Sequence, residues 1–133
     1  MSEADTSAVR VAVEEFLVAF DHLDWERFRR CFAPDATVFF PWDRYPRRAE
    51  GATEVEAEFN RFFDEVRTRA SGPPYLNLVP HDMAIQVWQD VALVTFHLDR
   101  PSTIGRRSLV LQRQAQRWRI VHLHASSITV PNT

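Results

Sequence analysis

The amino-acid sequence predicts an α+β fold in which three helices cover one face of a mostly antiparallel sheet. Apolar residues recur with the helical period up to about residue 70, and they alternate with a period of two from residue 75 onward. Segment 71–74, Ser-Gly-Pro-Pro, separates the two patterns. A run of helices followed by a run of strands is typical of helices packed on one side of a sheet. The 133 residues show no internal repeat, so they are expected to form a single domain, residues 1–133.

Three amphipathic segments predict the helices. Residues 5–22 carry an apolar stripe with spacings of three and four. Asp24 is the expected N-cap of a second, short helix. Thr53 and Glu56 have the spacing of a capping box at the start of a third helix, which ends at segment 71–74.

Runs of β-branched and aromatic residues predict the strands. They cover residues 36–40, 75–80, 83–88 and 91–98, and a long hairpin spans residues 105–127. If residues 115–117 form the hairpin turn, Val110 pairs with His122 and Ser108 pairs with His124.

The two faces of this hairpin differ in character. Leu109 and Leu123 belong to the more apolar face, which is expected to lie under the helices. The opposite face is mixed, because large apolar side chains and histidines share it. A mixed face of this kind is typical of a subunit interface, so the sequence predicts a homodimer that packs sheet to sheet. The expected interface lies near His97, Val110, Trp118, Ile120, His122 and His124.

The pair His122 and His124 has a second interpretation. Two histidines at positions i and i+2 of one strand share a face and suit a transition-metal site, with His97 on a nearby strand. No carboxylate or cysteine clearly completes the ligand set, however. We therefore expect hydrogen bonding at the interface for these histidines, with no metal and no organic cofactor.

Composition excludes several classes of partner. The formal net charge of −2 argues against a nucleic acid or an anionic membrane surface as the main partner. All 16 basic residues are arginine, whose planar guanidinium suits carboxylates and phosphates. No apolar run approaches the ~20 residues of a membrane span. The acidic amino terminus lacks a signal-peptide pattern, so a cytoplasmic location is the expectation.

Three local signatures resemble one known superfamily. They are Leu23-Asp24-Trp25 followed by Cys-Phe-Ala-Pro-Asp-Ala at residues 31–36, Gly51 before the third helix, and the closing strand WRIVHLHAS at residues 118–126. With the predicted order of elements, they resemble the nuclear transport factor 2-like (NTF2-like) superfamily, and the closing strand is similar to that of its SnoaL-like (polyketide-cyclase-like) branch. It also resembles the association domain of calcium/calmodulin-dependent kinase II. The resemblance implies a cone-shaped α+β barrel.

This superfamily holds enzymes such as ketosteroid isomerase and polyketide cyclases, and also non-catalytic binding or assembly domains, so the fold alone does not define a chemistry. By the resemblance, the general-base aspartate of the isomerase falls at Phe40, its oxyanion-donating tyrosine at Phe16, and its protonated aspartate at or next to Leu109. Apolar residues cannot transfer protons, so steroid-isomerase chemistry is not expected. The arginines thought to line the kinase association domain fall near Phe96, Leu109 and Ala125, so that pattern is also missing.

The resemblance implies an opening in the cone, and hence an apolar pocket between helices and sheet. The alternative is a core filled by side chains. The expected ligand-binding residues are Phe16, Phe40, Trp42, Tyr45, Phe59, Phe63, Tyr75, Asn77, Phe96, Leu109 and Leu123. If the protein is an enzyme, Asp43 or His81 is the expected acid or base, and Arg107 the partner of an anion or oxyanion.

Two hypotheses therefore follow from the sequence. The first is a homodimer that binds a small, mostly hydrophobic molecule and transforms it without a cofactor, as an isomerase, cyclase, dehydratase or hydrolase. The second is a non-catalytic ligand-binding or association domain.

Overall fold

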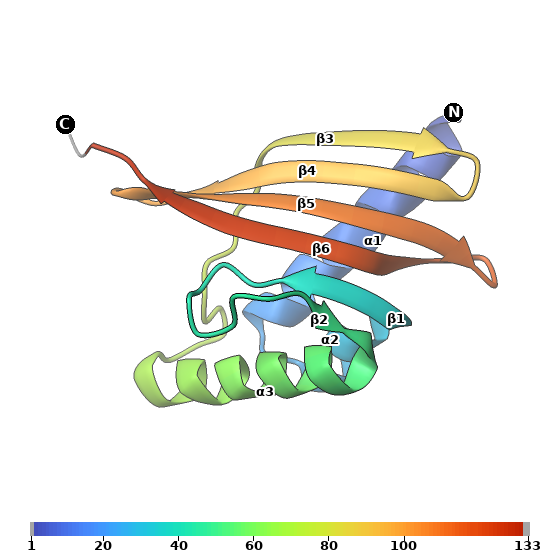
Figure 1. Cartoon of the computed structure of the whole chain (residues 1–133). Helices are drawn as coiled ribbons and strands as arrows, with labels where there is room; N and C mark the ends of the chain where they lie inside the picture. The colour runs from blue at the N-terminus through green and yellow to red at the C-terminus, as the bar shows by residue number, and fades with distance from the viewer. Residues whose placement is uncertain (1, 132–133) are drawn as a thin grey trace.

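The computed structural model describes residues 2–131 and contains three helices and six strands in that range (Figure 1). The helices are α1 (Glu3–Asp21), α2 (Trp25–Arg30) and α3 (Gly51–Arg69). The strands are β1 (Phe32–Phe39), β2 (Ala49–Glu50), β3 (His81–Trp88), β4 (Val91–Asp99), β5 (Thr103–Gln114) and β6 (Arg117–Thr129). None of the described helices combines the length and the hydropathy needed to cross a bilayer.

The six strands form one curved, unclosed sheet in the order β2-β1-β6-β5-β4-β3 (Figure 1). Strands β1 and β6 run parallel, and every other neighbouring pair is antiparallel. The helices pack on one side, which we call the inner face, and the opposite side is the outer face. The predicted α+β architecture is confirmed.

Helix α1 forms where its apolar stripe predicts. The Ser2 side chain accepts a hydrogen bond from the Asp5 amide and caps the amino terminus. The stripe residues Val9, Val13 and Phe16 are buried against the sheet. The predicted cap of α2 is also present, because the Asp24 carboxylate accepts from the Arg27 amide.

The start of α3 differs from the prediction. The helix begins at Gly51, whose φ of +83° suits glycine, and Thr53 and Glu56 form no capping box. Instead, the Glu54 carboxylate accepts from the backbone N–H of Glu50 at 3.1 Å. The amide of the N-cap residue is therefore satisfied as in a capping box, but the cap is Glu50 instead of Thr53, and the carboxylate comes from the fourth residue after the cap instead of the third.

The hairpin of β5 and β6 corrects the predicted assignment of faces. Its turn contains two residues, Ala115 and Gln116, both with positive φ, instead of the predicted three. Val110 pairs with His122 as expected, but Leu111 pairs with Ile120, so Val121 is an extra residue in β6. One inserted residue reverses the alternation of side chains beyond it.

The prediction that Trp118 and Ile120 lie on the outer face is therefore wrong. Their exposed fractions are 9% and 1%, and both belong to the inner hydrophobic core. The guanidinium of Arg113 lies 5.1 Å from the centroid of the Trp118 ring. The bulge at Val121 lets β6 turn Trp118 and Ile120 inward on one side of it, and Leu123 inward on the other.

The predicted strand at residues 75–80 is also wrong. The backbone amides of Leu76, Asn77 and Leu78 donate to the Asp21 carboxylate, at 2.8, 2.8 and 3.0 Å. Asn77 has a positive φ of 55°, which breaks extended geometry. The donors that a strand would offer to a sheet are instead bound to the end of α1.

Replacement of Trp118 by alanine tests the inner position of this side chain. The variant is expected to lose about 3–5 kcal/mol of unfolding free energy, because it leaves a cavity in the core. Urea denaturation measures the loss. Trp88→Ala is the matched control, since Trp88 is 56% exposed at the edge of the sheet and its removal is expected to cost much less. Equal small losses would contradict the bulged register.

Candidate ligand-binding cavity

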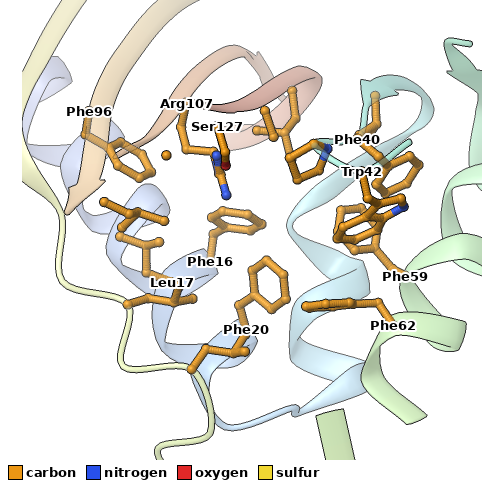
Figure 2. A pocket seen from close by; sticks show the side chains of 18 of the residues that line it. Phe16, Leu17, Phe20, Phe40, Trp42, Phe59, Phe62, Phe96, Arg107 and Ser127 are labelled. Carbon is orange, nitrogen blue, oxygen red and sulfur yellow. The ribbon is translucent and has the colours of Figure 1, made fainter. Parts of the chain in front are cut away.

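A cavity of about 230 Å³ lies between α1, α3 and the inner face of the sheet (Figure 2). Apolar and aromatic side chains from α1, β1, β4, β6 and α3 form most of its wall. Thr103 and Ser127 contribute hydroxyl groups, and Arg100 and Arg107 contribute the charges. Within the described residues, the wall contains no Asp, Glu, His, Tyr or Cys.

Aromatic packing determines where this space ends. The Phe28 ring lies 4.8 Å from Phe59 and 5.0 Å from Phe63, measured between centroids, and Phe28 and Phe63 are fully buried. Leu109 is fully buried as well. These side chains fill the core beyond the cavity, so the unfilled space remains among Phe16, Phe20 and the loops.

Trp42 forms one side of the cavity and is fixed by a buried carboxylate. Its ring stacks on Phe40 at 5.2 Å and on Phe62 at 4.7 Å. Its Nε1 donates to Glu58 Oε2 at 2.7 Å, and Nε of Arg44 donates to the same oxygen at 2.8 Å. Glu58 is only 5% exposed, so these donors compensate the burial of its charge.

The role of Glu58 was not predicted from the sequence. It lies three residues after Val55 and four before Phe62, within the apolar stripe of α3. A carboxylate at such a position requires donors from another element, and that requirement is the signal available in the sequence. The donors come from the loop at residues 41–48.

The segment at residues 75–78 forms another part of the wall. Leu76 and Leu78 line the cavity, and the contact of their amides with Asp21 fixes their position. Neither leucine was predicted as a site residue. Arg100, also at the cavity, donates to the backbone carbonyl of Leu76. Asp21, at the end of α1, thus holds the segment at residues 76–78, and this segment in turn accepts a hydrogen bond from Arg100.

The predicted ligand-binding residues fall into two groups. The structure places six of the eleven on the cavity wall, namely Phe16, Phe40, Trp42, Phe59, Phe96 and Leu123. It places the other five elsewhere, namely Tyr45, Phe63, Tyr75, Asn77 and Leu109. The Tyr45 ring lies 5.3 Å from that of Phe40, and its hydroxyl donates to Glu54. Phe63 and Leu109 are core residues. Tyr75 and Asn77 belong to the segment whose backbone amides are bound by Asp21.

The two predicted acid or base residues are separated from the cavity. Asp43 is exposed and lines a shallower groove together with His124. His81 lies on β3, where its ring stacks with that of His97 at 6.0 Å. Phe16 and Phe40, at the positions that the resemblance relates to acid-base residues of ketosteroid isomerase, do line the cavity. The cavity wall itself therefore offers no carboxylate or imidazole to a ligand.

Arg107 is the predicted residue that brings a charge into the cavity. Its side chain points toward Phe16 (Figure 2). Nη1 donates to the backbone carbonyls of Arg106 and Ser126, both at 3.1 Å, and no ion pair among residues 2–131 includes it. Burial lowers the pKa of the Arg107 guanidinium to about 10, so it still carries its charge at neutral pH.

The histidine pair lies on the outer face. Nδ1 of His122 is 2.7 Å from the Thr37 hydroxyl, and the Phe39 ring lies 5.7 Å from His122 and 5.2 Å from His124. Burial, helped by the charges of His124 and Arg48, lowers the pKa of His122. Within residues 2–131, no three side chains of the His, Cys, Asp or Glu type gather as metal ligands do.

Cys31 is half-buried beside α2. Its Sγ donates to the Arg27 carbonyl at 3.4 Å. Burial is the main cause that raises the pKa of the thiol to about 11. A thiol in this state is a poor nucleophile at neutral pH.

Comparisons with known proteins identify related folds. A family model described as a SnoaL-like domain matches residues 9–131. A candidate dehydratase of the NTF2-like family from Streptomyces avermitilis has a TM-score of 0.80 at 18% identity, over 96% of this chain and 99% of its own. A candidate ketosteroid isomerase from Parabacteroides distasonis has a TM-score of 0.68 at 19% identity, over 90% and 85%.

A CaMKII hub from S. rosetta is also similar, with a TM-score of 0.73 at 24% identity, over 96% of this chain and 100% of its own. At these identities the solved structures show a shared fold and nothing finer. No curated protein matched the chain.

Removal of the Glu58 carboxylate tests the support of the cavity wall. Glu58→Ala is expected to lose about 2–4 kcal/mol of unfolding free energy, because Trp42 Nε1 and Arg44 Nε lose a buried acceptor. It should also change the fluorescence of Trp42. Glu65→Ala removes the more exposed partner of Arg44 and serves as the control, with a smaller loss expected. A Glu58 variant as stable as this control would contradict the anchoring role.

Proposed function

Since the chain belongs to the SnoaL-like domain family, we propose that it binds a small, mostly hydrophobic molecule in the apolar cavity. The observation that carries the proposal is the unfilled space of about 230 Å³ beside an otherwise densely packed aromatic core. An empty apolar cavity costs stability, since its lining lacks contacts on one side. A concave apolar wall with few polar groups is the usual form of a small-molecule site.

The chemistry of the wall favours binding over acid-base catalysis. The described wall residues include no side chain that titrates near neutral pH, and its two cations can stabilise negative charge but cannot act as general bases there. A cofactor-free isomerase, cyclase, dehydratase or hydrolase would need an acid or base from outside the wall, such as Asp43 in the adjoining groove. The non-catalytic alternative needs no such addition, and we favour it.

Association through the outer face is a second proposed function. Trp88 and Val91 are 56% and 40% exposed, although both are large apolar residues. Alternation along the paired strands places Leu93 and Val110 on this face as well, where they lie opposite one another. A homodimer that packs sheet to sheet would cover these side chains, together with His97, His122 and His124. The fold shared with a CaMKII hub is consistent with a role in assembly.

A neutral probe tests the proposed binding site. Indole, an apolar molecule of suitable size, is expected to raise the melting temperature of the protein, because it binds only the folded state. Ala125→Leu should abolish this shift by filling the cavity from β6, whereas Ala84→Leu on the exposed side of β3 should leave it unchanged. Differential scanning fluorimetry provides the measurement. An equal shift in the Ala125 variant would place the binding elsewhere, and no shift in any protein would refute the cavity as a site for such molecules.

Sedimentation velocity tests the proposed dimer. The wild-type protein is expected to sediment as a dimer at micromolar concentration, and Val110→Asp as a monomer, because a charge would be buried without a partner in the interface. Asn60→Asp, at an exposed position on α3 and away from the outer face of the sheet, is the control for the added charge. A wild-type monomer would refute the interface, and so would a Val110→Asp protein that remains a dimer.

A further inference from the structure

The charge of Arg107 has no counter-charge in the part of the chain that the structure describes. Its neighbours across the ladder are Phe96 on β4 and Ala125 on β6, and its neighbours on the same face of β5 are Gly105 and Leu109. All four are apolar. The two carbonyl oxygens that Nη1 contacts carry only partial charge. A half-buried cation in such surroundings is favoured by an anionic partner, because partial desolvation otherwise disfavours its charge.

Gly105 leaves the space that the guanidinium occupies. A Cβ atom built on Gly105 would lie 3.2 Å from Nη1 of Arg107, which is tighter than an ordinary contact. Glycine at this point of β5 therefore lets the Arg107 side chain lie along the strand and reach the cavity. Gly105 lies opposite Ser127, whose hydroxyl is at the same end of the cavity (Figure 2).

The cavity contains the guanidinium but no acidic side chain. Arg107 and Arg100 are the only charged residues on its described wall. These two guanidinium groups contribute a positive electrostatic potential to the cavity. They therefore favour a ligand with a negative charge at the Arg107 end. The remaining wall, with Phe16, Phe20 and Trp42, favours an apolar body.

The volume limits the size of that ligand. An apolar cavity of about 150 Å³ holds one benzene molecule, so 230 Å³ holds ~9 non-hydrogen atoms by simple scaling. A planar guanidinium pairs best with a planar carboxylate, through two parallel hydrogen bonds. A phosphate monoester carries close to two negative charges at neutral pH, and a single half-buried arginine compensates these poorly.

We propose that the cavity selects a small hydrophobic monocarboxylate, whose carboxylate pairs with Arg107 while its apolar body lies against the aromatic wall. This inference rests on the proposed function, to which it adds the chemical class of the ligand. Gly105 acts as a positioning residue, because it sets where the guanidinium lies.

Phenylacetate and its neutral isostere phenylacetamide test the charge requirement in isothermal titration calorimetry. The wild-type protein is expected to bind phenylacetate about 10–100-fold more tightly than phenylacetamide, the range for a charge-assisted pair over a neutral contact. Arg107→Met should reduce this ratio to near one while it keeps the affinity for phenylacetamide. Arg106→Met, at the exposed neighbouring position on the outer face, should leave the ratio unchanged.

Gly105→Ala provides a second variant that keeps every charge. It is expected to lower the affinity for phenylacetate more than that for phenylacetamide, because the new methyl group displaces the guanidinium. This variant keeps the inference falsifiable if Arg107→Met does not fold.

The outcomes separate the two proposals. Equal affinities for phenylacetate and phenylacetamide in the wild-type protein would overturn the monocarboxylate inference and leave binding in the cavity intact. A preference for phenylacetate that survives both Arg107→Met and Gly105→Ala would overturn the role of Arg107. If indole, phenylacetate and phenylacetamide all fail to bind, the proposed function fails and the inference fails with it.

Discussion

The extra residue in β6 is the constraint on which the arrangement of this protein depends. Without Val121 as a bulge, strict alternation would turn either Trp118 and Ile120 or Leu123 and Ala125 away from the helices. With it, one strand contributes Trp118 and Ile120 to the core and Leu123 and Ala125 to the cavity wall. The same bulge leaves His122 on the outer face.

Two carboxylates hold in place the loops that form the rest of the cavity wall. Asp21 binds three amides of the segment at residues 76–78, and Glu58 binds the indole N–H of Trp42 and the guanidinium of Arg44. Each carboxylate is satisfied by donors from a loop, so neither is available to a ligand. Arg107 differs from both, since its acceptors are neutral carbonyls and it faces the unfilled space. The two carboxylates that support the wall are thus balanced by loop donors, whereas Arg107 is a cation on the wall whose charge can be balanced by a bound molecule.

The sequence was sufficient for the fold because its periodicities are strong. The stripe of α1, the cap at Asp24 and the alternation of β4 and β5 all reflect local physics that acts within one element. The same alternation predicts that Arg107, two residues before Leu109 on β5, lies on the inner face. The segment at residues 75–80 could not be assigned in this way, since a distant carboxylate, Asp21, binds its amides.

The direction of the side chains on β6 could not be predicted, for a different reason. Large apolar side chains at positions 118 and 120 fitted either an interface or a bulge, and alternation alone could not distinguish them. Asp43 lies in a loop and His81 at the end of a strand, where side-chain direction depends on tertiary contacts. The role of Glu58 could not be predicted from the sequence, because it depends on the contact between α3 and the loop that carries Trp42. In each case the missing information is a contact between elements distant in the sequence.

A crystal structure of the protein soaked with 4-bromophenylacetate is the most direct measurement of the central claim. The bromine atom can be located by its anomalous scattering, independently of the rest of the ligand. The account predicts one bromine among the aromatic side chains of the cavity, with the carboxylate within hydrogen-bond distance of the Arg107 guanidinium. A ligand bound only outside the cavity, or bound inside it with the carboxylate turned away from Arg107, would contradict the account.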